Sequence, residues 1–455
     1  MEKKKYTSAF ISLTLLFFMW GFMTVLNDIL IPYLKGVFEL NYFKAMLVQF
    51  AFFLAYFIGS LLYFLISATK GDPINKIGYK KGIIAGLLVS ALGALLFYPA
   101  AQYHIYGFFL SALFVLGLGF TLLQISANPY VAILGPEESA SSRLNLAQGF
   151  NSLGTTIGPV IGGYLIFTFF KDAEGSDAVK IPYLVFASMF LLVAFFIRQT
   201  KLPVFTNSEE HVKGFGALKY PQLVFGMLAI FMYVGAEVSI GSMIINFLHL
   251  PEIVGLDKTL ASVYVAFYWG GQMIGRFLGA VSLSDIDNRF KKYGIMLIVP
   301  VTSFLVIGVV KGFETASIFC ILLLLNYLAF IFAGSKANRN LYVFAGINII
   351  LLAIVLGSKG NIAMWSLIGI GLFNSIMWSN IFTLAIAGLG KYTSQGSSLL
   401  VMMILGGAIL PLISGKVADI LGVQMAFIVP VFSYIYLMFY GLAGYRPKKI
   451  KKDNV

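Results

Sequence analysis

The sequence predicts an all-α membrane protein with about 14 transmembrane helices in two related halves. Of its 455 residues, 59% are hydrophobic and 11% are charged, whereas a soluble domain is roughly 45–50% apolar and about 25% charged. The hydrophobic residues form long uninterrupted runs. In addition, Gly154 and Pro159 recur as Gly406 and Pro411 at a constant offset of 252 residues, which indicates an internal duplication.

The apolar runs are long enough to cross a bilayer, because a membrane helix needs about 17–25 mainly apolar residues. The first half contains six runs, at about 8–36, 43–68, 82–101, 105–134, 144–170 and 181–198. The second half contains eight, at about 220–249, 259–283, 294–310, 316–333, 341–357, 361–388, 397–418 and 424–443. The basic head MEKKK resembles the start of a signal peptide, but no clear cleavage site follows, so we expect the first run to be retained.

Polar segments divide the chain and set its orientation. Lys and Arg concentrate in the loops on the side of both termini, which predicts cytoplasmic termini in a bacterial inner membrane. The predicted organisation is an N-terminal six-helix bundle (1–199), a cytoplasmic linker (200–219), a C-terminal six-helix bundle (220–284 and 335–445), an inserted transmembrane hairpin (285–334) and a basic cytoplasmic tail (446–455).

The inserted hairpin follows from a change in the repeat offset. Gly21 matches Gly235 at an offset of 214 residues, whereas the later matches lie 252 residues apart. Extra residues therefore enter the second half, and the stretch 285–334 supplies two spans with few polar residues. We interpret this pair as a peripheral hairpin that faces lipid, and a pair of spans preserves the orientation of all later helices.

The repeated segments also predict where a site lies. In each half a polar opening leads into a run with glycine and proline, at 139–163 and 393–415. Transporters build sites between two repeats from helices of this kind, which glycine and proline interrupt. We therefore expect a site at the interface of the halves.

The composition argues against several other functions. The net charge of +13 comes from short basic patches between apolar runs, so no nucleic acid partner is expected. The single Cys320 and three scattered histidines predict neither a disulfide framework nor a metal site. The sequence also lacks the clustered carboxylates or histidines that a membrane glycosyltransferase or acyltransferase needs, so we predict a protein that is not an enzyme and has no cofactor.

Amides inside the spans predict a polar cavity, because such groups are costly in hydrocarbon and face the bundle interior or water. Gln124 and Asn128 are spaced i,i+4, and Asn145, Gln148 and Asn151 are spaced i,i+3,i+6. Each set therefore shares one helix face. Amides offer both donors and acceptors, which suits a polyol. The alternative is that they only bond one helix to another.

Further candidates come from other spans. Substrate binding is also predicted for Asn27 in the first span and for Asn374 and Trp378 in the twelfth. The tryptophan ring could pack on the apolar face of a sugar. Arg276 lies about two turns from the cytoplasmic end of its span, so it could snorkel to the interface, and we predict a gating or helix-end role. Asn145 is assigned a similar gating or structural role.

Two carboxylates are candidates for ion coupling. Asp28 lies within the first span with no obvious basic partner on its own helix, as a group that binds and releases an ion in a carrier would. Glu237 has a related position in the seventh span, and Tyr233 lies one turn before it, where it can donate to the carboxylate. Structural ion pairs with other helices, or exposure in a wet vestibule, are the alternatives. A proton is the expected coupling ion, with sodium left open.

Four stretches carry a family resemblance: LNDILIPYL (26–34), LLQISANPYVAILGPEESASSRLNLAQGFNSLGTTIGP (122–159), IGRFLG (274–279) and IFTLAIAGLGKYTSQGSSLLVMMILGGAILP (381–411). With them the chain resembles the fucose, galactose and glucose permease branch of the major facilitator superfamily, the fucose:proton symporter family. The resemblance implies a twelve-helix core of two six-helix bundles, a sugar site between them, and symport with an ion. It also implies a proton-coupling role for Asp28 and a sugar-binding role for Gln148 and Asn151.

The resulting hypothesis is a symporter that imports a monosaccharide by alternating access and works as a monomer in the bilayer. Gln124 occupies a position that is glutamate in fucose-type members of the family, so the resemblance favours glucose or galactose. Import of fucose or N-acetylglucosamine, export of hydrophobic compounds, and sensing without transport are the alternatives.

Overall fold

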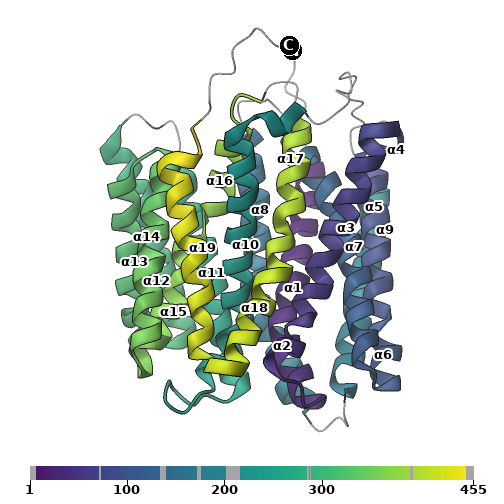
Figure 1. Ribbon diagram of the computed structural model, residues 1–455, viewed down its shortest axis with the longest axis horizontal. Coiled ribbons are helices and arrows are strands. Elements are labelled where there is room, and N and C mark those ends of the chain that lie inside the picture. The colour runs from purple at the N-terminus through teal and green to yellow at the C-terminus, as the bar shows by residue number, and fades with distance from the viewer. Residues whose placement is uncertain are drawn as a thin grey trace.

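The computed structural model is a bundle of roughly parallel and antiparallel helices, and both halves of the chain extend across its full height (Figure 1). The structure describes residues 7–70, 73–133, 140–171, 176–200, 216–283, 286, 288–389 and 393–446, and within this part it contains helices and no strand. The side chains of some helical residues, including Asn128 and Asn145, are outside the described set.

The helices follow the predicted spans closely. The first half contains α1 (Thr7–Val37), α2 (Tyr42–Ala45), α3 (Leu47–Lys70), α4 (Pro73–Ile77), α5 (Tyr79–Leu95), α6 (Phe97–Tyr103), α7 (Tyr106–Ile133), α8 (Ala140–Tyr164) and α9 (Lys180–Gln199). The second half contains α10 (Pro221–Leu248), α11 (Lys258–Ser282), α12 (Arg289–Lys311), α13 (Phe313–Ala333), α14 (Ala337–Gly357), α15 (Gly360–Asn374), α16 (Met377–Ile386), α17 (Thr393–Met402), α18 (Gly406–Leu421) and α19 (Ile428–Phe439).

Among the described residues, 13 helical segments are long and apolar enough to cross a membrane. The predicted eighth span, 259–283, corresponds to α11, which has 25 residues but is absent from these 13. Its composition explains the difference, since Gln272 and Arg276 make it more polar. α11 packs between α8, α10 and α15, and these helices shield its polar side chains from lipid.

The two halves pack their helices in the same pattern. In the first half α1 packs against α8, α7 packs against α3 and α5, and α5 packs against α9. In the second half α10 packs against α18, α15 packs against α11 and α14, and α14 packs against α19. Helices α12 and α13 lie outside this shared pattern at one edge of the bundle, where α13 packs against α14 and α12 packs against α11 (Figure 1).

The hairpin of α12 and α13 is held to the bundle more firmly than its sequence indicates. α12 is largely turned outward, and its Val309 is 80% exposed. In α13, however, Asn326 is fully buried and its Nδ2 donates to the carbonyl of Leu372 in α15 at 3.1 Å. One buried amide of α13 therefore anchors the hairpin to the core, while α12 forms its outer side.

The repeated segments differ in one respect from the prediction. α8 continues without a break through Pro159, whereas its counterpart is interrupted by a 3-10 turn at Met403–Leu405 between α17 and α18. A second interruption separates α15 from α16 at Ser375. Within the described chain, the predicted break in the repeated helix is therefore found in the second copy only.

The glycines of the repeat allow the helices of each half to approach closely. A Cβ atom on Gly154 would overlap the carbonyl oxygen of Phe18 in α1, and one on Gly406 would overlap the carbonyl of Phe231 in α10. Small residues at helix contacts let backbones pack against each other in membranes. The sequence repeat therefore preserves the same tight contact in both halves.

We predict that Gly154→Ala lowers the free energy of unfolding by about 1–3 kcal/mol, because the added methyl group overpacks this contact. Gly346→Ala in α14 is the matched control, since nothing lies within 4 Å of a Cβ built there. The control substitution is expected to be neutral or to stabilise the helix by up to about 1 kcal/mol. Thermal unfolding of both variants in detergent measures the difference, and equal midpoints would contradict the packing argument.

Candidate functional site

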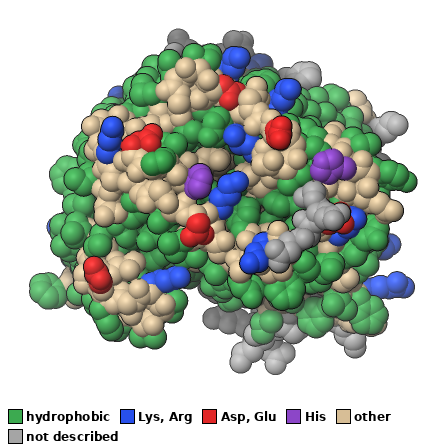
Figure 2. All heavy atoms as spheres, turned by 90° about the horizontal axis from the view of Figure 1, so that it is seen from below, with side chains coloured by type: hydrophobic (Ala, Val, Ile, Leu, Met, Phe, Trp, Pro, Cys, Tyr) green, Lys and Arg blue, Asp and Glu red, His purple; other side chains and the backbone are tan. Residues whose placement is uncertain are grey.

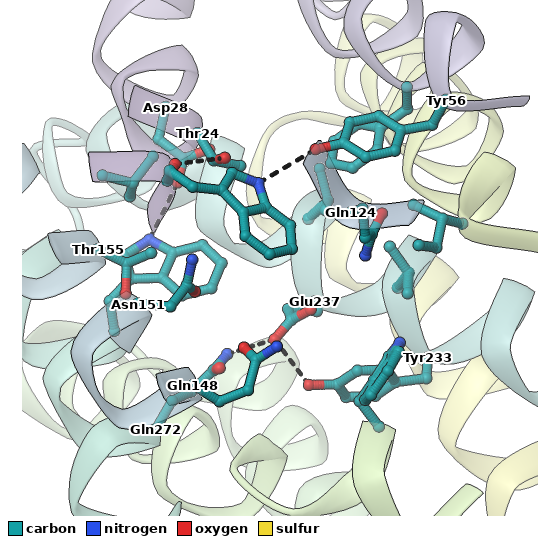
Figure 3. A pocket seen from close by; sticks show the side chains of 18 of the residues that line it. Thr24, Asp28, Tyr56, Gln124, Gln148, Asn151, Thr155, Tyr233, Glu237 and Gln272 are labelled. Atoms are coloured by element: carbon teal, nitrogen blue, oxygen red, sulfur yellow. Dashed lines mark hydrogen bonds between the residues drawn. The ribbon is translucent and has the colours of Figure 1, made fainter. Parts of the chain in front are cut away.

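A cavity of about 170 Å³ lies between the two halves. Its volume is below the roughly 300–1,000 Å³ of pockets for drug-sized ligands, so it suits a small molecule. Figure 3 shows side chains from both halves pointing toward this shared space. The polar and aromatic residues that line it are Trp20, Thr24, Asp28, Gln49, Phe53, Tyr56, Gln124, Gln148, Asn151, Thr155, Tyr233, Glu237, Trp269, Gln272, Arg276, Trp378 and Ser379.

Asp28 bridges the two halves at one wall of the cavity. Its Oδ1 accepts hydrogen bonds from Gln49 Nε2 in α3 at 3.1 Å and from Ser242 Oγ in α10 at 3.2 Å. Its Oδ2 accepts from Trp269 Nε1 in α11 at 3.0 Å. A Cβ at Gly241 would lie 3.1 Å from Oδ2, so glycine leaves room for the carboxylate. Two of the three donors thus belong to the opposite half of the chain.

Asp28 has no ion-pair partner in the described part of the chain, where the one salt bridge joins Asp177 to Lys180 at 2.8 Å. The carboxylate is 3% exposed. A buried carboxylate is stabilised only by the groups that donate to it. The alternative of a structural ion pair for Asp28 therefore finds no support in the described contacts.

Glu237 is held within the second half. Its Oε1 accepts from Tyr233 Oη at 2.7 Å, as the one-turn spacing indicates, and from Gln272 Nε2 at 2.6 Å. Tyr268 Oη also donates to the backbone carbonyl of Glu237 at 3.2 Å. Glu237 therefore joins α10 to α11, whereas Asp28 joins the first half to the second.

Arg276 points into the cavity and does not snorkel to the end of its helix. Its Nη1 donates to Ser152 Oγ, and to the carbonyl of Gln148 in α8 at 3.5 Å. Its Nε donates to the carbonyl of Ser375 at 3.3 Å, where α15 is interrupted, and Nη2 donates to Gln272 Oε1 at 3.3 Å. The guanidinium thus ties the second half to the first at another wall of the cavity.

Three of the predicted amides line the cavity, and two amides on its wall have an oxygen without a partner among the described residues. Gln124, Gln148 and Asn151 all contribute to the wall. Asn151 Nδ2 donates to the carbonyl of Phe17 at 3.0 Å, so this side chain also bonds α8 to α1. In contrast, the buried Oε1 atoms of Gln124 and Gln49 accept no hydrogen bond from the described residues. Buried acceptors of this kind need a donor from water or a ligand.

Two predicted ligands do not line the cavity. Asn374 is fully buried, where its Oδ1 accepts from Asn348 at 3.0 Å and from Tyr434 at 2.8 Å. Its Nδ2 donates to Tyr268 Oη at 3.0 Å, so this amide supports the helices behind Glu237. Asn27 is 1% exposed and also lies off the cavity wall. The place of an amide along its span therefore did not show whether its side chain lines the cavity or is buried between helices behind it.

The remaining predictions have different outcomes. Trp378 lines the cavity as expected and stacks on Phe382, with the ring centroids 5.0 Å apart. The side chains of Asn128 and Asn145 lie outside the described residues.

Sequence reasoning missed several residues of the wall, above all Gln49 and Tyr56 in α3. Tyr56 Oη accepts from Trp20 Nε1 at 3.2 Å. Gln49 Nε2 donates to Ser242 Oγ at 2.9 Å as well as to Asp28. An isolated glutamine inside the second apolar run was the available signal, but it shares no helix face with another amide.

The halves also meet at the end of the bundle opposite the C-terminal end of α19. Asp419 at the end of α18 accepts from the backbone N of Tyr42 at 2.7 Å and of Phe43 at 2.9 Å, at the start of α2. Lys258 Nζ donates to the carbonyl of Pro32 at 3.4 Å. Figure 2 shows this face, with charged side chains of both signs inside a largely hydrophobic rim. These contacts connect the halves on that side of the cavity.

Two bundles of paired helices with a polar cavity between them are typical of a membrane transporter. The chain belongs to the Major Facilitator Superfamily, whose family model matches residues 10–338, so it is a transporter and not an enzyme. It is 45% identical to the glucose/galactose transporter of Brucella abortus, over 97% of this chain and 95% of that one. It is 31% identical to the L-fucose-proton symporter of Escherichia coli, over 96% of this chain and 93% of that one.

The fold is similar to the crystal structure of the transporter FucP in the outward conformation. The TM-score is 0.65 at 30% sequence identity, and the match covers 96% of this chain and 98% of that one. The prediction of an all-helical protein of this superfamily is therefore confirmed.

We predict that Tyr233→Phe lowers the free energy of unfolding by about 1–3 kcal/mol, because it removes a donor from a buried carboxylate. Tyr436→Phe is the control, since Tyr436 Oη donates only to the exposed carbonyl of Phe225 at 3.1 Å. That change is expected to cost about 1 kcal/mol or less. Unfolding in detergent compares the two, and a larger effect in the control would refute the role of Tyr233.

Proposed function

We propose that the protein imports a monosaccharide into a bacterial cell by symport with protons, and that glucose or galactose is its substrate. The relatives named above as a glucose/galactose transporter and an L-fucose-proton symporter support this proposal. The protein works in the inner membrane as a monomer with cytoplasmic termini, the orientation favoured by its basic loops.

The observation that carries the proposal is a small cavity lined by tryptophan rings and by two amide side chains whose buried oxygens have no partner among the described residues. Gln124 Oε1 and Gln49 Oε1 can accept hydrogen bonds from sugar hydroxyls. Gln148 and Asn151 line the same cavity. A glutamine at position 124 offers a neutral donor and acceptor in place of a carboxylate. Trp378 presents an aromatic surface for the apolar face of a pyranose.

The way Asp28 is bound supports coupling to protons. The ionised carboxylate can accept from all three donors, Gln49, Ser242 and Trp269. A proton on one oxygen turns an acceptor into a donor, so at least one of these bonds weakens. Because Ser242 and Trp269 belong to the second half, binding or loss of a proton changes the attachment between the halves.

Alternating access then requires the contacts on either side of the cavity to open in turn. With cytoplasmic termini, the end of the bundle that holds Asp419 faces the outside of the cell. There the bonds from the start of α2 to Asp419 join the two halves. Entry of the sugar requires this contact to separate. The bonds of Arg276 to α8 join the halves at the cavity itself.

Fucose is a second candidate substrate, because the 31% identical relative is named for it. Uptake of labelled glucose, galactose, fucose and N-acetylglucosamine into proteoliposomes under an imposed proton or sodium gradient tests both candidates and both ions. Accumulation of glucose or galactose driven by protons is the expected result. No gradient-driven uptake of any of these sugars would refute the proposal.

We predict that Asp28→Asn abolishes uphill accumulation but retains exchange of sugar across the membrane. Without coupling, the ratio of internal to external sugar falls to about 1. Counterflow and gradient-driven uptake in the same vesicles distinguish the two activities. Asp177→Asn is the control, because this carboxylate pairs with Lys180 away from the cavity and its removal leaves accumulation intact. Normal accumulation in the Asp28 variant would remove it from the coupling role.

We predict that Gln124→Met weakens the apparent affinity for sugar by about tenfold, because it keeps the length of the side chain and removes the acceptor. Gln102→Met, at an exposed position, is the matched control and leaves affinity unchanged. The concentration dependence of uptake measures both. An unchanged affinity in the Gln124 variant would exclude a bond from this amide to the substrate.

A further inference from the structure

One face of α13, the inner helix of the hairpin, follows α15 to its last turn. Leu322, Asn326 and Phe330 are spaced four residues apart, so they share this face, and all three are buried. A Cβ atom on Gly369 in α15 would lie 2.9 Å from Leu322 Cδ2. One turn further, Asn326 Nδ2 donates to the carbonyl of Leu372 at 3.1 Å. The contact between the two helices therefore continues to the end of α15.

The same face of α13 also lies beside the segment that connects α15 to α16. A Cβ atom on Gly279 in α11 would overlap Ile376 of this segment, and it would lie 3.5 Å from the ring of Phe330. Both side chains therefore pack against one glycine. The hairpin thus flanks the interruption of the helix, with Asn326 before it and Phe330 next to it.

The bond from Asn326 goes to a carbonyl that a helix end leaves available. The last carbonyls of an α-helix have no partner within the helix, and α15 ends at Asn374, two residues after Leu372. The Leu372 oxygen accepts from Asn326 Nδ2 and, at 2.8 Å, from Ser375 Oγ. Side chains that enter the hydrogen-bond ladder of a helix cause kinks at that point. The two donors therefore help to fix the geometry of the interruption.

The carbonyls that follow are held by residues of the transport cavity. The carbonyl of Asn374 accepts from Tyr233 Oη at 3.1 Å, and that of Ser375 accepts from Arg276 Nε at 3.3 Å. Tyr233 and Arg276 both line the cavity. Asn326 differs from them, because it reaches the interruption from the hairpin and does not line the cavity.

Stability alone does not explain an amide at position 326. The side chain is fully buried, and its Oδ1 has no partner among the described residues. A buried polar atom without a partner is costly, so an apolar side chain of similar size would pack here at a lower cost. The bond to Leu372 therefore indicates that this amide fixes the position of the helix end.

The helix that begins after the interruption carries a ring of the cavity wall. Trp378 is the second residue of α16 and lies three residues after Ser375. Its ring stacks on Phe382 in the same helix, with the centroids 5.0 Å apart, so the ring moves with α16. Asn380 Nδ2 holds this helix at a second point, where it donates to the carbonyl of Ala337 at 3.3 Å. The place of Trp378 therefore depends on where the interruption directs α16.

We propose that Asn326 is a positioning residue for substrate binding. From the hairpin it holds the end of α15, and thereby it sets the start of α16 and the place of Trp378 at the transport cavity. The part that concerns sugar rests on the proposed function, in which this ring packs on a pyranose. A helix pair outside the shared packing pattern of the halves thus acts on the site between them.

The first test measures sugar affinity in Asn326→Leu, which keeps the approximate size of the side chain and removes the donor. The apparent KM for proton-driven uptake of glucose or galactose is expected to rise about fivefold, with the maximal rate little changed. Tyr327→Phe is the matched control on the same helix. It also removes a bond to a backbone carbonyl, but this bond goes to Tyr293 within the hairpin at 3.0 Å, so KM stays at the wild-type value.

A double-variant cycle tests whether Asn326 acts through the ring. In a Trp378→Phe background the effect of Asn326→Leu on KM is expected to shrink, because coupled residues are not additive. A rise of the same size in both backgrounds would overturn the proposed route through Trp378. Ser375→Ala removes the other donor to the Leu372 carbonyl and is expected to raise KM as well. It provides a second variant if Asn326→Leu does not fold.

A second readout needs no substrate. Ser379 lines the cavity next to Trp378, and Cys320 is the one cysteine of the sequence. The Ser379→Cys variant in a Cys320→Ser background therefore gives α16 a single site for maleimide labelling. Asn326→Leu is expected to change the labelling rate by about twofold or more, because it alters the populations of α16 positions. Tyr327→Phe is expected to leave the rate unchanged.

The two readouts distinguish the inference from the function on which it rests. If no sugar is taken up but labelling depends on Asn326, the proposed function fails and the positioning of α16 is supported. If sugar is taken up and Asn326→Leu changes neither KM nor the labelling rate, the positioning role is overturned. Equal changes in Asn326→Leu and Tyr327→Phe would also overturn it, because they would reflect a general effect of the hairpin.

Discussion

The bilayer gives polar groups no water, so each one must find a partner inside the protein or face a cavity. This constraint organises most of what distinguishes the structure. Asn374 satisfies it by bonding neighbouring helices, whereas Asn326 donates to Leu372 but its Oδ1 has no partner among the described residues. Gln124 and Gln49 satisfy it only in part: both line the cavity between the halves, and their buried Oε1 atoms have no partner in the described chain. Several incompletely satisfied amides of the described chain lie elsewhere, and Gln124 and Gln49 are the two on the cavity wall.

The same constraint makes the two carboxylates unequal. Glu237 receives its donors from α10 and α11, which belong to one half. Asp28 receives two of its donors from the opposite half. A change in the protonation of Asp28 therefore acts on the attachment between the halves, whereas a change at Glu237 acts within one of them. The corresponding helices α1 and α10 therefore each hold a carboxylate, but the two carboxylates bond to different parts of the protein.

The hairpin of α12 and α13 adds surface without changing the core pattern of helix packing. Its inner helix is anchored by Asn326, and its outer helix is exposed along most of its length. The hairpin also forms a second cavity at one end, where it meets α14. The insertion therefore adds to the second half without changing the helix pairs that surround the transport cavity.

The sequence by itself determined the class of the protein, because helices that cross a bilayer must be long and apolar. Polar residues inside such helices are costly, so the few that occur indicate a cavity or a helix contact. It predicted the helices, the duplication, and the place of Asp28, Glu237, Gln124, Gln148, Asn151 and Trp378 on the cavity wall. Tertiary structure decided which amides line the cavity and which are buried behind it, since Asn27 and Asn374 lie inside apolar spans just as Gln124 does. It also decided that Gln49 and Arg276 face the cavity, because the direction of a side chain depends on how each helix is rotated against its neighbours.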